Sequence, residues 1–260
     1  MPSTPESRSL AVFCDFENVA LGVREAKYAQ FDMDKVLERL LLKGSIVVKK
    51  AYCDWERYKE FKPAMHAASF EMIEIPHLRQ SGKNSADIRM VVDALDLCYT
   101  KQHVDTFVIV SGDSDFSPLV SKLRENAKTV IGVGVKNSSS DLLINNCDEF
   151  IYYDDLVRQD EQKRRAAKKR REAAPAGEDK KQEAYEVVLE TLNALIAERG
   201  AEEKIWGSMV KQALKRRKPG FNESYYGFRA FSDLLEEMQQ KALIKLDPDE
   251  KSGGYLIRPA

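Results

Sequence analysis

The chain has 260 residues, of which 43% are hydrophobic and 32% are charged, and its formal net charge is −1. This composition predicts a globular protein with one large domain or two smaller ones. It contains no apolar run of about 18 residues, which excludes a membrane-spanning helix, and its N-terminus lacks the pattern of a signal peptide, so we expect a cytoplasmic protein.

The first 155 residues alternate between short β-type runs and helical patterns. The alternation predicts a mainly parallel sheet with helices on both faces. The predicted helices span 32–44, 86–99 and 117–126, with Gly44 closing the first of them and Pro118 in the first turn of the third. The predicted strands span 10–16, 45–53, 71–78, 106–112, 129–135 and 149–154.

A charged segment follows, from Gln159 to Lys181, in which apolar periodicity is lost. It is either a solvated linker, helical before Pro175, or a basic strip that binds nucleic acid. Residues 1–160 carry 20 Lys and Arg against 25 Asp and Glu, a net charge of −5, whereas residues 161–260 carry 21 against 17, a net charge of +4. The basic half therefore suggests a polyanionic partner. The seven cations of the strip are Lys163, Arg164, Arg165, Lys168, Lys169, Arg170 and Arg171.

The remaining residues predict a small helical domain that ends in a hairpin. Helical patterns cover 184–200, 205–219 and 224–243, and two strands around a polar turn lie within 243–259. Three helices followed by a hairpin are the plan of a winged helix.

Aspartates follow two of the strands predicted in the first half. Asp15 ends the first strand, and Asp113 and Asp115 follow the fourth, in "FVIVSGDSDF". In an open parallel sheet, ligands bind beyond the carboxyl ends of the strands, where the strand order reverses. If the first and fourth strands are neighbours at that reversal, Asp15 and Asp113 face each other there.

Asp87 is a third candidate for the same crevice. It stands four, seven and eleven residues before Val91, Ala94 and Cys98, at the head of the apolar stripe that should face the sheet. Helix capping explains this position equally well, and the sequence does not decide between the two roles. Asp96 falls on the opposite face, where we expect it to be solvated.

Carboxylates gathered in one cleft repel one another unless a cation lies between them. Oxygen ligands suit Mg²⁺ or Mn²⁺, which can orient a water for attack on a phosphate. The four cysteines and three histidines are scattered, with no C-x-x-C pair, so we expect reduced core thiols rather than a zinc site. The proposed ligands, also expected to be catalytic, are Asp15, Asp87, Asp113 and Asp115.

Four blocks of the first half, in this order and spacing, resemble a NYN domain of the LabA-like group, within the PIN-like nucleases. They are "FCDFENV", "KNSADIRMVVDAL", "VIVSGDSDFSPLVSKLRE" and "NCDEFIYYD". The resemblance covers roughly residues 8–156 and implies a three-layer α/β sandwich with a central parallel sheet. It also implies metal-dependent cleavage of RNA, with the four aspartates as metal-binding acids.

The same resemblance adds further candidates. Asn18 matches the asparagine of the first block, where its amide would position a metal-bound water or a phosphate. Lys83 and Asp93 fit the second block, but the helical wheel places Asp93 away from the apolar stripe, so we leave it out of the site and keep Lys83 as an RNA contact. The hydroxyls of Ser138 to Ser140 could line the cleft or merely form a turn.

The last part of the chain, residues 183–258, resembles an OST-HTH (LOTUS) domain, a winged-helix module associated with RNA binding. "IWGSMVKQALKRRKPGFNESYYGFRAFSDLL" and "GGYLIRP" carry this resemblance. Cations and aromatic rings in it offer charge and stacking surfaces for nucleic acid. We expect Phe228 to be one of these rings and Phe231 to lie in the core. The proposed RNA contacts here are Lys215, Arg216, Arg217, Lys218, Tyr225 and Tyr226.

Taken together, these features predict a nuclease domain over 8–156, a basic linker over 157–182 and a winged-helix domain over 183–258. The predicted function is a metal-dependent endoribonuclease with an appended RNA-binding domain. An RNA-binding adaptor with a weak or inactive cleft is the alternative. A phosphatase is disfavoured because Glu17 stands where that class needs a second aspartate. A homo-oligomer and protein partners of the C-terminal domain are left open.

Overall fold

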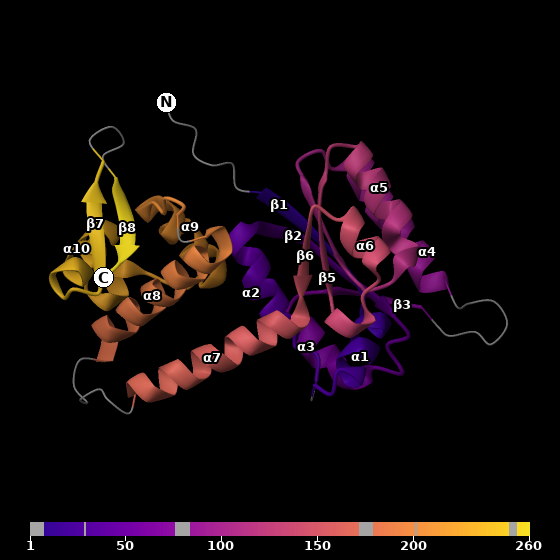
Figure 1. Cartoon of the computed structure of the whole chain (residues 1–260), viewed down its shortest axis with the longest axis horizontal. Coiled ribbons are helices and arrows are strands. Elements are labelled where there is room, and N and C mark those ends of the chain that lie inside the picture. The colour runs from indigo at the N-terminus through magenta and orange to yellow at the C-terminus, as the bar shows by residue number, and fades with distance from the viewer. Residues whose placement is uncertain (1–7, 29, 76–83, 172–178, 201, 250–253) are drawn as a thin grey trace. The chain divides into compact units, whose positions relative to one another are not determined.

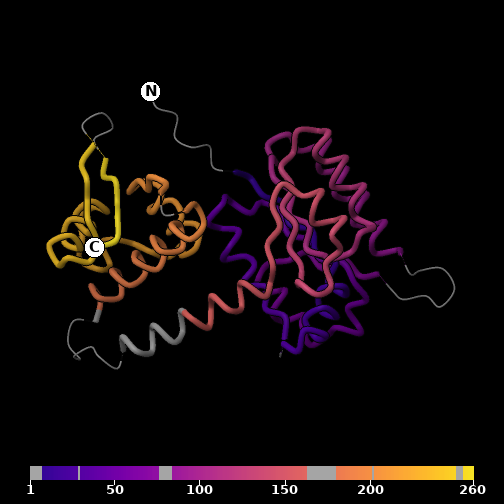
Figure 2. The backbone as a smooth tube through the Cα atoms, viewed as in Figure 1, coloured from indigo at the N-terminus to yellow at the C-terminus, as the bar shows by residue number. Residues whose placement is uncertain are grey.

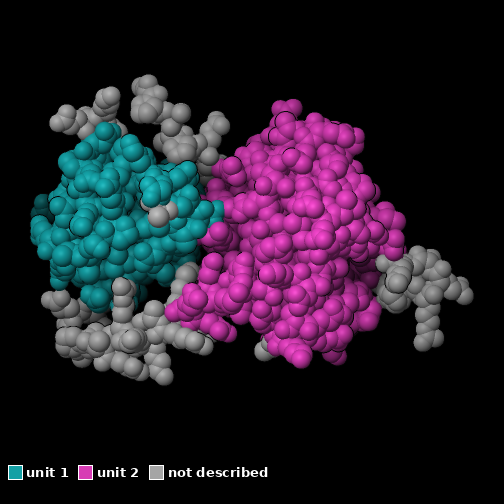
Figure 3. All heavy atoms as spheres, viewed as in Figure 1, with its two compact units in different colours: residues 1–6, 169–260 teal, residues 7–168 magenta. Residues whose placement is uncertain are grey.

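The computed structural model describes residues 8–28, 30–75, 84–171, 179–200, 202–249 and 254–260, with side chains omitted over 163–179. The chain divides into two compact units, Ser7–Lys168 and a second one that contains Lys169–Ala260 (Figure 3). None of the helices described in these ranges is long and apolar enough to cross a membrane.

Within the described residues of the first unit, six parallel strands form one sheet in the order β3-β2-β1-β4-β5-β6. All six predicted strands are present, so the parallel sheet is confirmed. The third is shorter than expected, and the rest of its predicted range, from residue 76, lies outside the described residues. The strands are β1 (Arg8–Asp15), β2 (Gly44–Cys53), β3 (Glu71–Glu74), β4 (Thr106–Val110), β5 (Thr129–Gly134) and β6 (Glu149–Tyr152).

Helices cover both faces of this sheet, because successive strand residues point to opposite sides. Leu10, Val12 and Cys14 of β1 pack into one core cluster, and Ala11 and Phe13 pack into the other. The first cluster includes α1 (Phe16–Glu25), α2 (Met33–Lys43), α3 (Lys62–Ala67) and the start of α7 (Tyr153–Arg171). The second includes α4 (Ser85–Thr100), α5 (Ser117–Glu125) and α6 (Asp141–Asn146), which gather on one side of the sheet in Figure 1.

The chain winds outward from β1 in two directions, which creates the reversal point expected from the sequence. It moves from β1 to β2 and β3 at one edge, then returns to β4 and continues to β5 and β6 (Figure 2). β1 and β4 are neighbours, with Cys14 paired to Val110. The carboxyl ends of these two strands therefore lie side by side at the reversal. Short 3-10 turns lie at Lys59–Phe61, Ser114–Phe116 (η2) and Lys136–Ser138.

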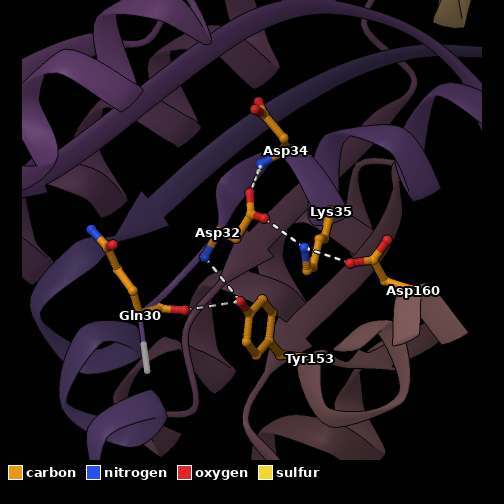
Figure 4. A network of polar contacts seen from close by, with 6 residues as sticks. All are labelled: Gln30, Asp32, Asp34, Lys35, Tyr153 and Asp160. Atoms are coloured by element: carbon orange, nitrogen blue, oxygen red, sulfur yellow. Dashed lines mark hydrogen bonds and ion pairs between the residues drawn. The ribbon is translucent and has the colours of Figure 1, made fainter. Parts of the chain in front are cut away.

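The basic segment is the continuation of a helix that starts inside the first unit. Tyr153 and Leu156 of α7 are buried in the first core cluster. The hydroxyl of Tyr153 accepts from the backbone N–H of Asp32 (2.9 Å) and donates to the carbonyl of Gln30 (3.4 Å). Beside it, Lys35 forms ion pairs with Asp32 (2.6 Å) and Asp160 (2.9 Å), and Figure 4 shows these contacts joined in one network. The start of α7 is thereby fixed to the loop that precedes α2.

The second unit has the winged-helix plan, with one correction to the predicted elements. Its helices are α8 (Asp179–Arg199), α9 (Gly207–Arg217) and α10 (Phe231–Gln240), and strands β7 (Ile244–Pro248) and β8 (Tyr255–Pro259) form an antiparallel hairpin. The predicted third helix, 224–243, is instead a 3-10 turn, Glu223–Tyr226 (η4), followed by α10. Gly227, at φ 87°, ends the turn in a left-handed conformation that a continuous helix cannot contain.

Candidate functional site

The site begins with Asp15, the last residue of β1 and the N-cap of α1. The apolar run before it is fully buried, which places the carboxylate at the edge of the core with only 7% of the residue exposed. Its Oδ1 accepts from the backbone N–H of Asn18 (3.4 Å), and its Oδ2 accepts from the hydroxyl of Ser111 (3.0 Å). These two bonds fix the orientation of the carboxylate.

The end of β4 is joined to the end of β1 through side chains. Besides the bond from Ser111 to Asp15, the backbone N–H of Gly112 donates to Oδ1 of Asn18 (2.9 Å). Ser111 Oγ also accepts from the N–H of Asp113 (3.2 Å), and Asp113 Oδ1 accepts from the N–H of Asp115 (3.0 Å). Asp113 is thus held directly beyond β4 as the cap of the η2 turn.

Gly112 allows a third strand end to approach this junction. A Cβ on Gly112 would lie 2.3 Å from the carbonyl oxygen of Ser138, a separation that real side chains do not reach. The hydroxyl of Ser139 donates to the carbonyl of Val135 (2.8 Å), and the hydroxyl of Ser140 caps α6 by accepting from the N–H of Leu142 (3.2 Å). These serine hydroxyls hold the loop after β5, so we assign the loop a positioning role.

Asp87 lies in the first turn of α4, half-buried. Met90, Ala94 and Cys98 form the buried stripe of this helix, and Val91 is only partly buried. Asp96 is exposed, as predicted. The N-cap of α4 is Asn84, whose side chain makes no capping hydrogen bond with the described residues.

Electrostatic coupling shows that the acids share one region. Burial and the charges of Asp87 and Asp113 together raise the pKa of Asp15 to about 7, against the opposing hydrogen bonds from Ser111 and Asn18. Burial, and then the charges of Asp113, Asp115 and Glu17, raise the pKa of Asp87. The ends of β1 and β4 and the start of α4 therefore create a site where negative charge is in excess.

A hard divalent cation fits this set of donors, although the carboxylates do not enclose one. Among the described residues, no three His, Cys, Asp or Glu side chains form a ready-made metal site. Mg²⁺, however, keeps several of its waters and is commonly held by one or two carboxylates together with substrate phosphate. Asp15, Asp87 and Asp113 provide oxygen donors of this kind.

Asn18 and Asp93 have partners that the sequence did not reveal. Oδ1 of Asn18 is engaged by Gly112, so this amide holds the two strand ends together. Asp93 was expected to point away from the sheet, but it accepts from the hydroxyl of Tyr52 on β2 (2.9 Å) and from Nε of Arg89 (3.0 Å). Its role in an ion-paired contact between α4 and β2 keeps it outside the acid cluster.

The candidate RNA contacts of the second unit differ in accessibility. Tyr225 is 61% exposed, and Lys180 Nζ lies 4.8 Å from the centre of its ring. Lys215 and Lys218 are exposed, Tyr226 is partly buried against Phe221, and burial and the charge of Arg199 lower the pKa of the half-buried Arg216.

Two side chains of this unit face inward. The side chain of Arg217 is 4% exposed and is ion-paired with Glu190 (2.9 Å), so we leave it out of the proposed RNA surface. Phe228 is 5% exposed and packs on Tyr185, so the expectation that it stacks on nucleic acid is wrong and it belongs to the core with Phe231.

Some predicted RNA contacts lie outside the described residues. Lys83 lies outside the described residues. The backbone of the strip from Lys163 to Arg171 forms the end of α7, but its side chains also lie outside them. The seven cations therefore remain proposals.

Ser111 is the site residue that the sequence reasoning missed. It lies in the same "SGDSD" segment as Asp113, but a serine at the end of a strand resembles any turn residue. Only its bond to Asp15, 96 positions earlier in the chain, distinguishes it.

Comparisons with known proteins agree with this geometry. The family model for the NYN domain matches residues 9–154, and that for the OST-HTH/LOTUS domain matches residues 183–251. The uncharacterized protein MJ0482 of Methanocaldococcus jannaschii is 30% identical over 125 residues, which are 48% of this chain and 49% of that relative, so the match spans about half the length of each. The crystal structure of VPA0982, a protein of unknown function from Vibrio parahaemolyticus, superposes with a TM-score of 0.53 at 27% identity and covers 59% of this chain and 98% of that one.

Proposed function

Because this chain belongs to the NYN domain family and carries an OST-HTH/LOTUS domain after it, we propose that it is a metal-dependent endoribonuclease with an appended RNA-binding domain. The observation that carries the proposal is the acid cluster at the reversal point of the sheet. Burial and the neighbouring carboxylates raise the pKa of Asp15 to about 7 there, so the site favours a positive charge. An open edge of this kind admits an extended polymer.

In this proposal Asp15, Asp87 and Asp113 hold Mg²⁺ or Mn²⁺. The bound ion would supply a polarised water and neutralise the charge that develops on the phosphate oxygens. Ser111 and the backbone N–H of Asn18 keep the carboxylate of Asp15 in one orientation. Asp115, which is exposed within η2, remains the fourth proposed ligand, and its charge helps to raise the pKa of Asp87.

The second unit supplies the attraction for RNA that the acidic first half lacks. Tyr225 offers an exposed ring with the Lys180 ammonium above it, which suits stacking of an unpaired base close to a phosphate. Glu223 lies in the same η4 turn as Tyr225. Burial raises the pKa of its carboxyl, but hydrogen bonds and the charges of Lys211 and Lys215 lower it overall. Lys215 is therefore close to this turn. We assign these side chains, with the linker cations, to RNA binding.

One observation favours the alternative function. Since the described acids do not enclose a metal ion as they stand, the chain could hold RNA in a cleft that cleaves poorly. The adaptor and the nuclease make opposite predictions for turnover.

The test uses the full-length chain, an internally labelled single-stranded RNA and a DNA of the same sequence. The nuclease predicts internal cleavage of the RNA with Mn²⁺ or Mg²⁺ and none after chelation. Binding without cleavage, under both metals and at every protein concentration, would support the adaptor and contradict the nuclease.

A further inference from the structure

A groove beside α4 adjoins the acid cluster. It lies between α4, the η2–α5 segment and α6, and has a volume of about 670 Å³. Asp87 and Asp115 belong to its lining, so one end of the groove is part of the acidic site. This volume is within the usual range of small-molecule pockets, about 300–1,000 Å³.

The walls of the groove are unusually apolar for an exposed surface. Ile88 is 63% exposed, Val92 55% and Leu142 58%. These are three of the six large hydrophobic side chains that are exposed in the described part of the chain. Single exposed apolar residues are common, but a group that lines one hollow marks a binding surface.

A buried hydroxyl in the same groove has no hydrogen-bond partner among the described residues. Ser117 lines the groove at the start of α5 and is only 6% exposed. Its Oγ makes no hydrogen bond within the described residues. Buried hydroxyls are nearly always paired, so this one lacks a partner that a ligand would provide.

We infer that this groove binds a nucleobase of single-stranded RNA, next to the phosphate held at the acid cluster; the inference rests on the proposed function. The side chains of Ile88, Val92 and Leu142 offer apolar contact to the face of a base, and Ser117 offers a hydroxyl to its polar edge. Asp87 belongs to both sites, so a base in the groove and a cation-bound phosphate at the acids lie within one or two nucleotides of each other. A groove for a protein partner would not need to adjoin the acid cluster.

The chemistry of the groove also limits what it selects. A serine hydroxyl both donates and accepts, so it can pair with the edge of any base and confers little sequence preference. A base in a duplex is stacked and paired, and must leave the stack before it can enter. The groove therefore selects unpaired RNA rather than a particular sequence.

The experiment measures cleavage, with Mn²⁺, of a single-stranded RNA that has one mapped cleavage site. Matched substrates carry an abasic ribose at the nucleotide on either side of that site. For the full-length chain, we expect removal of one of these two bases to lower kcat/KM about 10-fold or more. Val92→Ala combined with Leu142→Ala should cause a similar loss on the intact RNA and little further loss on the abasic one. Val47→Ala, an exposed apolar residue on β2 outside the groove, is the control and should change nothing.

The outcomes separate this inference from the proposed function. Cleavage that is insensitive to both abasic positions, or to the groove substitutions, overturns the nucleobase site and leaves the nuclease intact. If the parental chain cleaves no RNA, the nuclease fails, and the base is then tested by binding of intact and abasic RNA to the chain; equal affinities overturn the inference. Unchanged RNA cleavage with an altered oligomeric state in the groove variant, measured by light scattering, also overturns it and assigns the groove to a protein interface.

Discussion

The carboxylate of Asp15 lies where a negative charge is costly, because burial and two neighbouring acids oppose its ionisation. The fold nevertheless holds it in place with bonds from Ser111 and Asn18. An acid kept in such a position, with no ion-pair partner among the described residues, is typical of a functional site rather than of a stabilising contact.

Replacing Asp15 with Asn should remove a pH-dependent loss of stability. The pKa of Asp15 is about 7 in the folded chain, against about 4 in an unfolded one. The folded state therefore binds the additional proton between these values, and stability falls as the pH rises from about 4 to about 7. In chelator at pH 8, Asp15→Asn should melt at least about 4 °C above the parental chain, and the difference should shrink towards pH 4. Identical pH profiles of the two melting temperatures would show that ionisation of Asp15 does not lower the stability of the folded chain.

For Asp87, the test distinguishes a metal ligand from an acid that only stabilises the start of α4. Asn84 occupies the N-cap, and an acid in the first turn stabilises the helix modestly through its dipole. Asp87→Asn removes this gain together with the repulsion from Asp113 and Asp115, so stability in chelator should change little. As a ligand, Asp87 predicts that millimolar Mn²⁺ raises the melting temperature of the parental chain but much less that of the variant. Asp96→Asn, on the solvated face of the same helix, should respond to Mn²⁺ like the parental chain. An equal Mn²⁺ response of all three proteins would assign Asp87 to stabilising the start of α4 alone.

The local sequence pattern was enough to predict helices and strands wherever the spacing of the apolar residues was clear. The six strands and the helices α2, α4 and α5 follow from it. The adjacency of β1 and β4 was only a condition in the sequence analysis, and the strand order of the sheet meets it. The local pattern failed where a contact with a distant residue, or a single backbone angle, determines the structure. Gly227 breaks a helix that the pattern continued, and Asp93 of α4 turns towards Tyr52, which lies on strand β2.

The network at the start of α7 should stabilise the first unit without affecting its chemistry. Tyr153→Phe leaves the N–H of Asp32 without its acceptor in a partly buried place, which should lower the free energy of unfolding by about 1–3 kcal/mol. Cleavage at a temperature well below the transition should be unchanged, since Tyr153 lies outside the acid cluster. Chemical unfolding checks the stability, and a variant as stable as the parental chain would contradict the role assigned to this network.

For the whole molecule, the uneven charge suggests a division of labour between the two halves. The first 160 residues carry a net charge of −5 and the last 100 a net charge of +4. The sequence indicated this division, and it indicated the acid cluster, because both depend on residue type and order. It did not reveal that Arg217 is buried against Glu190 or that Ser111 bonds to Asp15, because these contacts join elements far apart in the chain.

The division predicts how binding depends on salt. Replacing the seven cations from Lys163 to Arg171 with Gln in the full-length chain should weaken RNA binding, and each lost phosphate contact should flatten the plot of log affinity against log salt by roughly 0.7. kcat at saturating RNA should change little. Residues 1–162, which retain the pair between Lys35 and Asp160, should lose more affinity. Unchanged slopes in both proteins would reduce the strip to a solvated linker.

Single-turnover cleavage of a labelled RNA, followed as Mn²⁺ is added, tests the acid cluster most directly. Three proteins are compared: the parental chain, Asp113→Asn and, as control, Asp96→Asn. We expect metal-dependent internal cleavage by the parental chain and the control, and a rate at least about 100-fold lower for Asp113→Asn, which should still bind RNA and melt no lower than the parental chain in chelator. Cleavage by Asp113→Asn at the parental rate would show that the acid cluster is not the catalytic site.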